Sequence, residues 1–141
     1  MTDTRPILVG YDGRAGSQAA LGEALRVGRD LGATVVVLFS FEAIRIGGEA
    51  ADLDAVIDEH GRVVLADAVA RAEQAGAQIE TTQRAQPIIE GLLEEADERD
   101  AQMIVVGSTG EGPLRGLIVG STPYKLLHAS TRPVLVVPSR G

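Results

Sequence analysis

Cysteine and tryptophan are absent from the 141 residues of this chain, and histidine occurs only twice. The lack of cysteine excludes disulfides, thiol catalysis and thiolate metal sites. With only two histidines, a metal centre built from several imidazoles is not expected. Aromatic residues make up 3% of the chain, which is too few for the stacking platforms that bind single-stranded nucleic acid.

Basic residues are also scarce beside acidic ones, thirteen against twenty, so the formal net charge is −7. An acidic chain is a poor candidate for binding nucleic acid or an anionic membrane surface, because both require a basic surface. No apolar run approaches the roughly 18 residues of a membrane span. The apolar run Ile7–Val9 is too short for the core of a signal peptide. We therefore expect no nucleic acid and no membrane as partner, and a cytoplasmic location.

The length and composition suit one globular domain, which we expect to span residues 1–141. Short apolar runs alternate with stretches of helical period, and this alternation predicts an α/β fold with a parallel sheet covered by helices on both faces. The expected helices cover residues 17–31, 52–75, 87–99 and 122–128. The expected strands are Ile7–Val9, Thr34–Phe41, Gln78–Arg84, Met103–Val106 and Pro133–Val137.

The expected strands differ in polarity. Thr34–Phe41 is a nearly continuous apolar run, which is typical of a parallel strand buried on both faces. Gln78–Arg84 is far more polar, and we place it at an edge of the sheet. Ligands of such sheets bind beyond the carboxyl ends of the strands, where the strand order reverses. The residues after the first and fourth strands are therefore the candidate site.

Glycine and hydroxyl residues gather after the fourth strand with the spacing G-x2-G-x9-G-S. Gly107 and Gly110 lack side chains, so a ligand could approach their backbone closely. Gly120 precedes a helix, whose first amides and dipole attract an anion. Ser121 and Thr122 offer hydroxyls either to that anion or as helix caps. An ordinary flexible loop is the alternative interpretation of this segment.

The glycine segment, the sequence Val9–Gly13 after the first strand and the ending Pro133–Val137 together resemble the universal stress protein family, in particular its ATP-binding branch. The likeness runs from about residue 5 to residue 138. It implies a doubly wound, open, parallel five-stranded sheet of order 3-2-1-4-5. This is a Rossmann-like three-layer sandwich of the adenine nucleotide alpha hydrolase type. It also implies a cytoplasmic protein that binds ATP or another adenine nucleotide and acts in stress response or dormancy.

The resemblance implies roles for individual residues as well. Asp12 would hold the ribose hydroxyls, and Phe41 would lie against the adenine. The residues beside the nucleoside would be Gly10, Tyr11, Val106 and Gly107, and those around the phosphates would be Thr109, Gly110, Gly120, Ser121 and Thr122. The ligand would be ATP, ADP or AMP. The glycine segment is formally neutral within an acidic chain, which favours a cation such as Mg²⁺ beside the phosphates.

Two positions depart from the family pattern. Pro123 stands where the family usually has serine or threonine, and proline lacks both a hydroxyl and an amide hydrogen. Arg14 stands where the family often has serine, and its side chain could reach a phosphate. Asp12 has an alternative reading as a turn or N-cap residue. His60 and His128 are expected to be structural or surface residues without a catalytic role.

Two alternative functions stay open at this point. The loss of a donor at Pro123 favours an interaction module of the same family that is dimeric and does not bind nucleotide. The other alternative is a slow ATPase. We see no general base, P-loop lysine or arginine finger, and we assign no catalytic residue.

The last strand adds a prediction about assembly. In the order 3-2-1-4-5 it lies at an edge of the sheet, yet Val134–Val137 is wholly apolar. An exposed apolar edge is a template for pairing with another chain. We therefore predict a homodimer formed through this strand.

Overall fold

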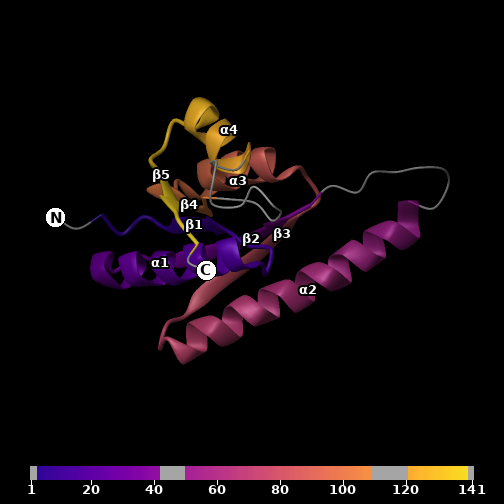
Figure 1. Ribbon diagram of the computed structural model, residues 1–141, viewed down its shortest axis with the longest axis horizontal. Coiled ribbons are helices and arrows are strands. Elements are labelled where there is room, and N and C mark those ends of the chain that lie inside the picture. Colours follow the sequence, from indigo (N-terminus) through magenta and orange to yellow (C-terminus); the bar gives the residue numbers. More distant parts are fainter. Residues whose placement is uncertain (1–2, 42–49, 109–120, 140–141) are drawn as a thin grey trace.

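The computed structural model describes residues 3–41, 50–108 and 121–139. They form one parallel sheet with the strand order β3-β2-β1-β4-β5 and helices on both of its faces (Figure 1). The expected fold class and strand order are confirmed, and every expected strand and helix lies within two residues of its predicted bounds. The elements are β1 (Ile7–Gly10), α1 (Ala15–Leu31), β2 (Val35–Ser40), α2 (Ala50–Gln74), β3 (Ile79–Arg84), α3 (Ile88–Arg99), β4 (Met103–Gly107), α4 (Ser121–Ala129) and β5 (Val134–Val137).

The sheet separates two hydrophobic cores, because successive residues of a strand point to opposite faces. Ile7 and Val9 of β1 pack with α1 and α2 on one face. Leu8, between them, packs with α3 and α4 on the other face. The central strands are buried on both sides, which explains why β1, β2 and β4 are continuous apolar runs. Within the described ranges, no helix is long and apolar enough to cross a membrane.

The polar edge strand β3 is joined to α3 by a cluster of charged side chains. Glu95 is 5% exposed, and it is the one charged residue classed as buried in the described part of the chain. Arg84 donates to Glu95 from Nε at 2.7 Å, and Arg99 donates to it from Nε at 2.5 Å. Arg84 also pairs with Glu94 at 3.1 Å and with Glu98. A charge at this depth is tolerated because both carboxylate oxygens have a cationic partner.

This cluster predicts a pH-dependent loss of stability. Burial acts to raise the pKa of Glu95, but the hydrogen bonds from Arg99 and Arg84 outweigh it and hold the pKa below its usual value. The pKa is lower in the folded than in the unfolded chain. Glu95 therefore contributes stability above the unfolded pKa, about 4.3, and this contribution is lost as the pH falls through the folded pKa.

We expect Arg84→Met to lower the free energy of unfolding at pH 7 by about 2–3 kcal/mol, because Glu95 keeps only one of its two partners. As the pH falls below about 4.3, the difference from the wild type should shrink because the carboxylate protonates. Urea unfolding at several pH values measures both effects. Arg26→Met removes two surface ion pairs on α1, with Glu23 and Asp30, and is the control. An equal loss in the two variants would contradict this account.

Candidate functional site

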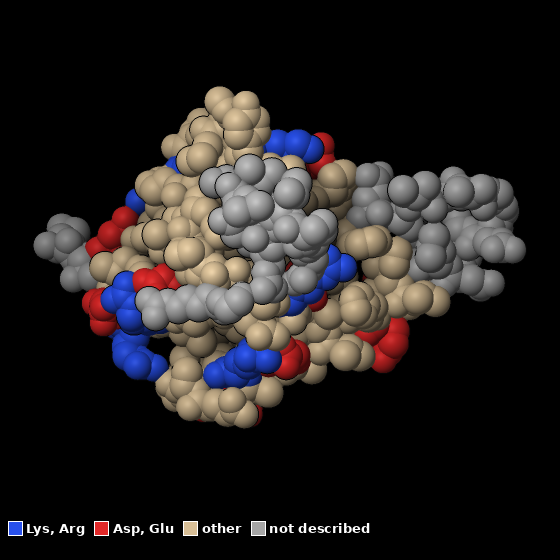
Figure 2. Space-filling model, in the orientation of Figure 1, with Lys and Arg blue, Asp and Glu red and all other residues tan. Residues whose placement is uncertain are grey.

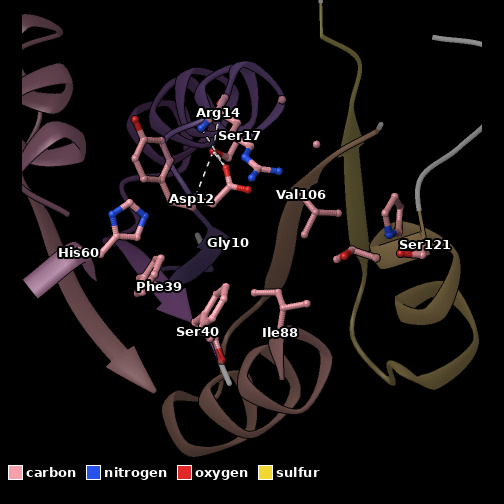
Figure 3. Close-up of a pocket in the computed structure, with 16 residues that line it drawn as sticks. Gly10, Asp12, Arg14, Ser17, Phe39, Ser40, His60, Ile88, Val106 and Ser121 are labelled. Carbon is pink, nitrogen blue, oxygen red and sulfur yellow. Dashed lines mark hydrogen bonds between the residues drawn. The ribbon is translucent and has the colours of Figure 1, made fainter. Parts of the chain in front are cut away.

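A cavity of about 380 Å³ lies at the carboxyl ends of β1, β2 and β4 (Figure 3). β1 pairs with β2 on one side and with β4 on the other, so the chain reverses its direction of winding at this point. Sheets of this kind bind their ligands at that reversal. The volume lies within the range of roughly 300–1,000 Å³ that is usual for small-molecule sites.

Most of the residues expected from the sequence meet at this cavity. The expected residues that line it are Gly10, Tyr11, Asp12, Phe41, Val106, Gly107, Ser121 and Thr122. Thr109, Gly110 and Gly120 lie outside the described residues, as does most of the glycine segment. The cavity thus joins the segment after β1 to the end of β4 and the start of α4, which are far apart in the sequence.

The turn between β1 and α1 fixes the carboxylate of Asp12. Its Oδ1 accepts hydrogen bonds from the Arg14 amide at 2.9 Å and from the Ser17 hydroxyl at 2.8 Å. The turn passes through Gly13 at φ +83°, a left-handed conformation that favours glycine. Gln18 donates to the carbonyl of Gly13 at 2.8 Å and holds the turn from the first turn of α1. Within the described chain Oδ2 accepts no hydrogen bond, which leaves it available to a ligand.

The alternative reading of Asp12 is partly correct. Asp12 does organise a turn, but it is not the N-cap of α1, because the helix begins at Ala15 and Arg14 is the capping residue. Arg14 makes no capping hydrogen bond with its side chain. The turn contacts occupy one oxygen of Asp12, so they are compatible with ligand binding by the other.

Gly107 has a packing role that sequence reasoning missed. A Cβ at Gly107 would lie 2.7 Å from the carbonyl oxygen of Gly16 and 2.8 Å from its carbon. Both are backbone atoms of the first turn of α1, so they cannot rotate away. The missing side chain lets β4 and α1 meet where both line the cavity, whether or not a ligand also approaches Gly107. By contrast, a Cβ at Gly10 would meet Leu92 at an ordinary 3.5 Å.

Three rings form an aromatic wall, defined by Phe39, Phe41 and His60. Phe39 and Phe41 stack with centroids 6.3 Å apart and planes inclined by 4°. His60 meets the edge of Phe39 at 5.7 Å and 77°. Phe41 is half exposed. The wall offers a planar ring system an apolar surface on which to stack.

His60 is a lining residue that the sequence did not indicate. It comes from the middle of α2, where it was expected to have a structural or surface role only. The nearby signal was Gly61, whose absent side chain lets α2 approach Phe39; a Cβ there would lie 2.8 Å from the Phe39 ring. A glycine within a helix indicates that another element lies close to the helix, but it does not show which residue of that element makes the contact.

Tyr11 is a lining residue whose hydroxyl is bonded to a neighbouring helix. The residue is 2% exposed, and the hydroxyl donates to Asp67 of α2. Burial and this hydrogen bond raise the pKa of Tyr11 well above its usual value. The hydrogen bonds from Tyr11 and from Arg71, the latter at 3.0 Å, lower the pKa of Asp67. Tyr11 therefore ties β1 to α2, and its hydroxyl is already committed.

The N-terminus of α4 also lines the cavity, through Ser121, Thr122 and Pro123. The helix begins at Ser121, one residue before the expected start at Thr122, and Pro123 is its third residue. The first four amides of an α-helix have no partner within the helix. Proline is tolerated at this position because its missing hydrogen removes no helical bond. Among its first four residues the helix therefore has three such amide hydrogens instead of four.

Among the described residues that line the cavity, Asp12 has the one carboxylate and Arg14 has the one guanidinium. Elsewhere on the described surface shown in Figure 2, basic and acidic side chains are interspersed. In the described part of the chain, no group of three or more histidine, aspartate or glutamate side chains could hold a metal ion. The described residues alone thus provide no metal centre.

Comparison with known proteins decides the family. The model of the universal stress protein family matches residues 3–138. The chain belongs to the universal stress protein family. A universal stress protein of Mycolicibacterium smegmatis is 34% identical over 142 residues, which cover 96% of this chain and 46% of that protein. The chain therefore spans about half the length of this relative.

Solved structures agree with this assignment. A universal stress protein crystallised in complex with cAMP is 28% identical, with a TM-score of 0.74, over 96% of this chain and 98% of that one. The universal stress protein UspA from Lactobacillus plantarum has a TM-score of 0.84 at 20% identity, over 97% and 99% of the two chains. The second likeness concerns the fold, since its sequence identity is low.

Proposed function

We propose that this universal stress protein binds an adenine nucleotide in the cavity, with ATP as the ligand that its glycine motif favours. The observation that carries the proposal is the convergence of three features on one cavity at the reversal of strand order. These features are a carboxylate held by a turn, an aromatic wall and the N-terminus of α4. A relative of 28% identity was crystallised with cAMP, which supports an adenine nucleotide as the class of ligand.

The aromatic wall suits the base. Phe41 is exposed on one face and follows β2 directly, with its amide bonded to the carbonyl of Arg84 at 3.1 Å. A purine lying against Phe41 would cover this apolar surface and gain stacking energy. Gly10, Tyr11, Val106 and Gly107 would then lie beside the nucleoside.

Asp12 suits the ribose. A carboxylate accepts hydrogen bonds from two vicinal hydroxyls, and bonds to a charged acceptor are stronger than neutral ones. The Oδ1 atom is held by Arg14 and Ser17, so the group is already oriented before a ligand arrives. Such preorganisation lowers the entropy cost of binding.

The phosphates would lie toward α4 and the glycine segment. The amides at the start of α4 and the hydroxyls of Ser121 and Thr122 provide donors there. Thr109, Gly110 and Gly120 complete the proposed phosphate site by their place in the sequence motif. Mg²⁺ belongs to the proposal as a counter-ion of the phosphates, held chiefly by the nucleotide itself.

We propose that the protein acts through binding, in stress response or dormancy in the cytoplasm. No catalytic residue is assigned. Asp12 has the one carboxylate among the described lining residues, and its position suits binding of the ribose rather than activation of a water molecule. Phosphate release should therefore be far slower than about 1 per second, a rate at the low end of typical enzymes. Faster release would favour the ATPase alternative.

Thermal unfolding with and without nucleotide tests the function. A ligand at 100 times its dissociation constant stabilises the folded state by about 2.7 kcal/mol, which raises the midpoint of a domain of this size by several degrees. We expect ATP, ADP or AMP to produce such a rise. The absence of any shift with all three at millimolar concentration would favour the interaction module instead.

We also propose a homodimer through β5. Among the described residues β5 is an edge strand that pairs with β4 alone, and its four apolar residues are each partly exposed. Light scattering at micromolar concentration should give twice the chain mass of 14.7 kDa. A mass of one chain would contradict this proposal and would leave nucleotide binding untouched.

A further inference from the structure

Arg14 lies at the mouth of the proposed nucleotide site. It is the residue that precedes α1, two positions after Asp12, and it lines the cavity. Its amide donates to Asp12 Oδ1 at 2.9 Å, so the backbone at this point is fixed by the turn. Figure 3 places Arg14, Asp12 and Ser17 together at the α1 side of the cavity, with Ser121 across from them.

The guanidinium of Arg14 stands apart from the other arginines that the structure describes. Each of the others is bonded to a carboxylate or, for Arg29, to the carbonyl of Ala75. Within residues 3–41, 50–108 and 121–139, nothing accepts a hydrogen bond from the Arg14 guanidinium. Carboxylates outnumber cations in this chain, so a cation that lines a cavity without a carboxylate partner is notable.

On the opposite side of the cavity, the start of α4 lacks one hydrogen-bond donor. Pro123 is the third residue of α4 and has no amide hydrogen, so this N-terminus offers an anion fewer donors than an ordinary helix. Arg14 carries the positive charge of the described lining. A guanidinium presents two parallel N–H groups that match two oxygens of a phosphate.

We propose that Arg14 binds a phosphate group of the ligand and makes the site selective for nucleotides over nucleosides. This inference rests on the proposed function, because it assigns a role within the same site. Asp12 and Arg14 then divide the ligand between them: the carboxylate contacts the sugar, and the guanidinium contacts the phosphate two residues further along the turn. Arg14 also offsets the donor that Pro123 removes from α4.

Calorimetric titration with adenosine, AMP and ATP tests this division. Arg14→Gln should raise the dissociation constants of AMP and ATP about tenfold or more. A loss of this size is typical when a hydrogen bond to a charged group is removed. The affinity of Arg14→Gln for adenosine should stay within about twofold of the wild-type value, because adenosine has no phosphate group that could contact Arg14. Arg14→Lys should recover part of the loss, since it keeps the charge without the paired geometry.

Arg26→Gln is the matched control. It makes the same charge change on α1, but Arg26 pairs with Glu23 and Asp30 at the surface and lies outside the cavity lining. It should leave the affinity for all three ligands unchanged. Added salt should weaken ATP binding more in the wild type than in Arg14→Gln, since the wild type has one more charge interaction to screen. Arg14→Lys keeps the test valid if Arg14→Gln folds poorly, because it retains the positive charge at this position and should still bind AMP and ATP more weakly than the wild type.

Unchanged ATP affinity in Arg14→Gln would overturn the inference and leave the proposed function standing. An equal loss for adenosine and ATP would overturn it as well, because the residue would then act through the turn. If the wild type binds none of the three ligands, the proposed function fails first and the inference fails with it. The last result appears before any variant is made, so the two failures are distinguishable.

Discussion

Replacing Gly107 with alanine should destabilise the protein by about 2–3 kcal/mol and disrupt nucleotide binding. The added Cβ would lie 2.7 Å from the carbonyl oxygen of Gly16, closer than such atoms approach each other. The start of α1 would have to move away from β4. The turn that holds Asp12 and Arg14 leads directly into this part of α1, so the cavity would change with it. Urea unfolding and ATP titration measure the two effects.

Gly10→Ala is the matched control for stability. Gly10 also ends a strand at the cavity, but its Cβ would meet only the side chains of Leu92 at 3.5 Å and Ile88 at 3.7 Å, which are ordinary contacts. We expect a change below about 1 kcal/mol. Equal stabilities for the two alanine variants would show that α1 and β4 do not pack as closely as described. The proposed packing role of Gly107 would then be wrong.

Replacing Asp12 with asparagine should raise the dissociation constant for ATP by about 10- to 100-fold, because two hydrogen bonds from ribose would lose their charged acceptor. Asparagine keeps an oxygen that can accept from the Arg14 amide and the Ser17 hydroxyl. The turn should therefore survive, and the loss should reflect the ligand contact. Calorimetry with ATP gives the two dissociation constants.

A ligand without ribose hydroxyls sharpens this prediction. The wild type should bind 2′,3′-dideoxy-ATP more weakly than ATP, whereas Asp12→Asn should distinguish the two much less. Such a double comparison isolates the contact between the carboxylate and the hydroxyls. Asp30→Asn, at the far end of α1, is the control for charge. The same discrimination in wild type and Asp12→Asn would contradict the role assigned to Asp12.

The fold was predictable because its signals are local. The apolar run Val35–Phe39 is buried throughout, as expected for a strand covered on both faces. The polar strand β3 lies at an edge, where one side is free of other strands. Gly32 directly follows the last residue of α1 and caps the helix in a left-handed conformation, which is a common way for glycine to end a helix.

The site was predictable only where it follows a strand in the sequence. The Gly10–Asp12 and Val106–Gly107 segments lie at strand ends, and parallel strands bring their carboxyl ends to one edge. His60 of α2 and Ile88 of α3 also line the cavity but were not predicted. Their inclusion depends on how α2 and α3 pack on the sheet, and helical periodicity does not show which residue of a helix faces a distant loop.

Two glycines within helices give a partial indication of how α2 and α3 pack on the sheet. A Cβ at Gly61 would collide with Gln83 and Phe39, and one at Gly91 would collide with Ser40. Both indicate that a helix lies unusually close to β2 or β3. For Gly107 the sequence motif gave only part of the reason for the glycine. Its place in the motif suggested room for a ligand, whereas the structure shows that it also gives room to α1.

Calorimetric titration of the wild-type protein with ATP, with ADP and AMP in parallel, tests the central claim most directly. The account predicts binding at one site per chain with a dissociation constant in the micromolar range, and a strong loss of affinity in Asp12→Asn. No heat of binding with any of the three nucleotides, from a protein shown to be folded, would contradict it.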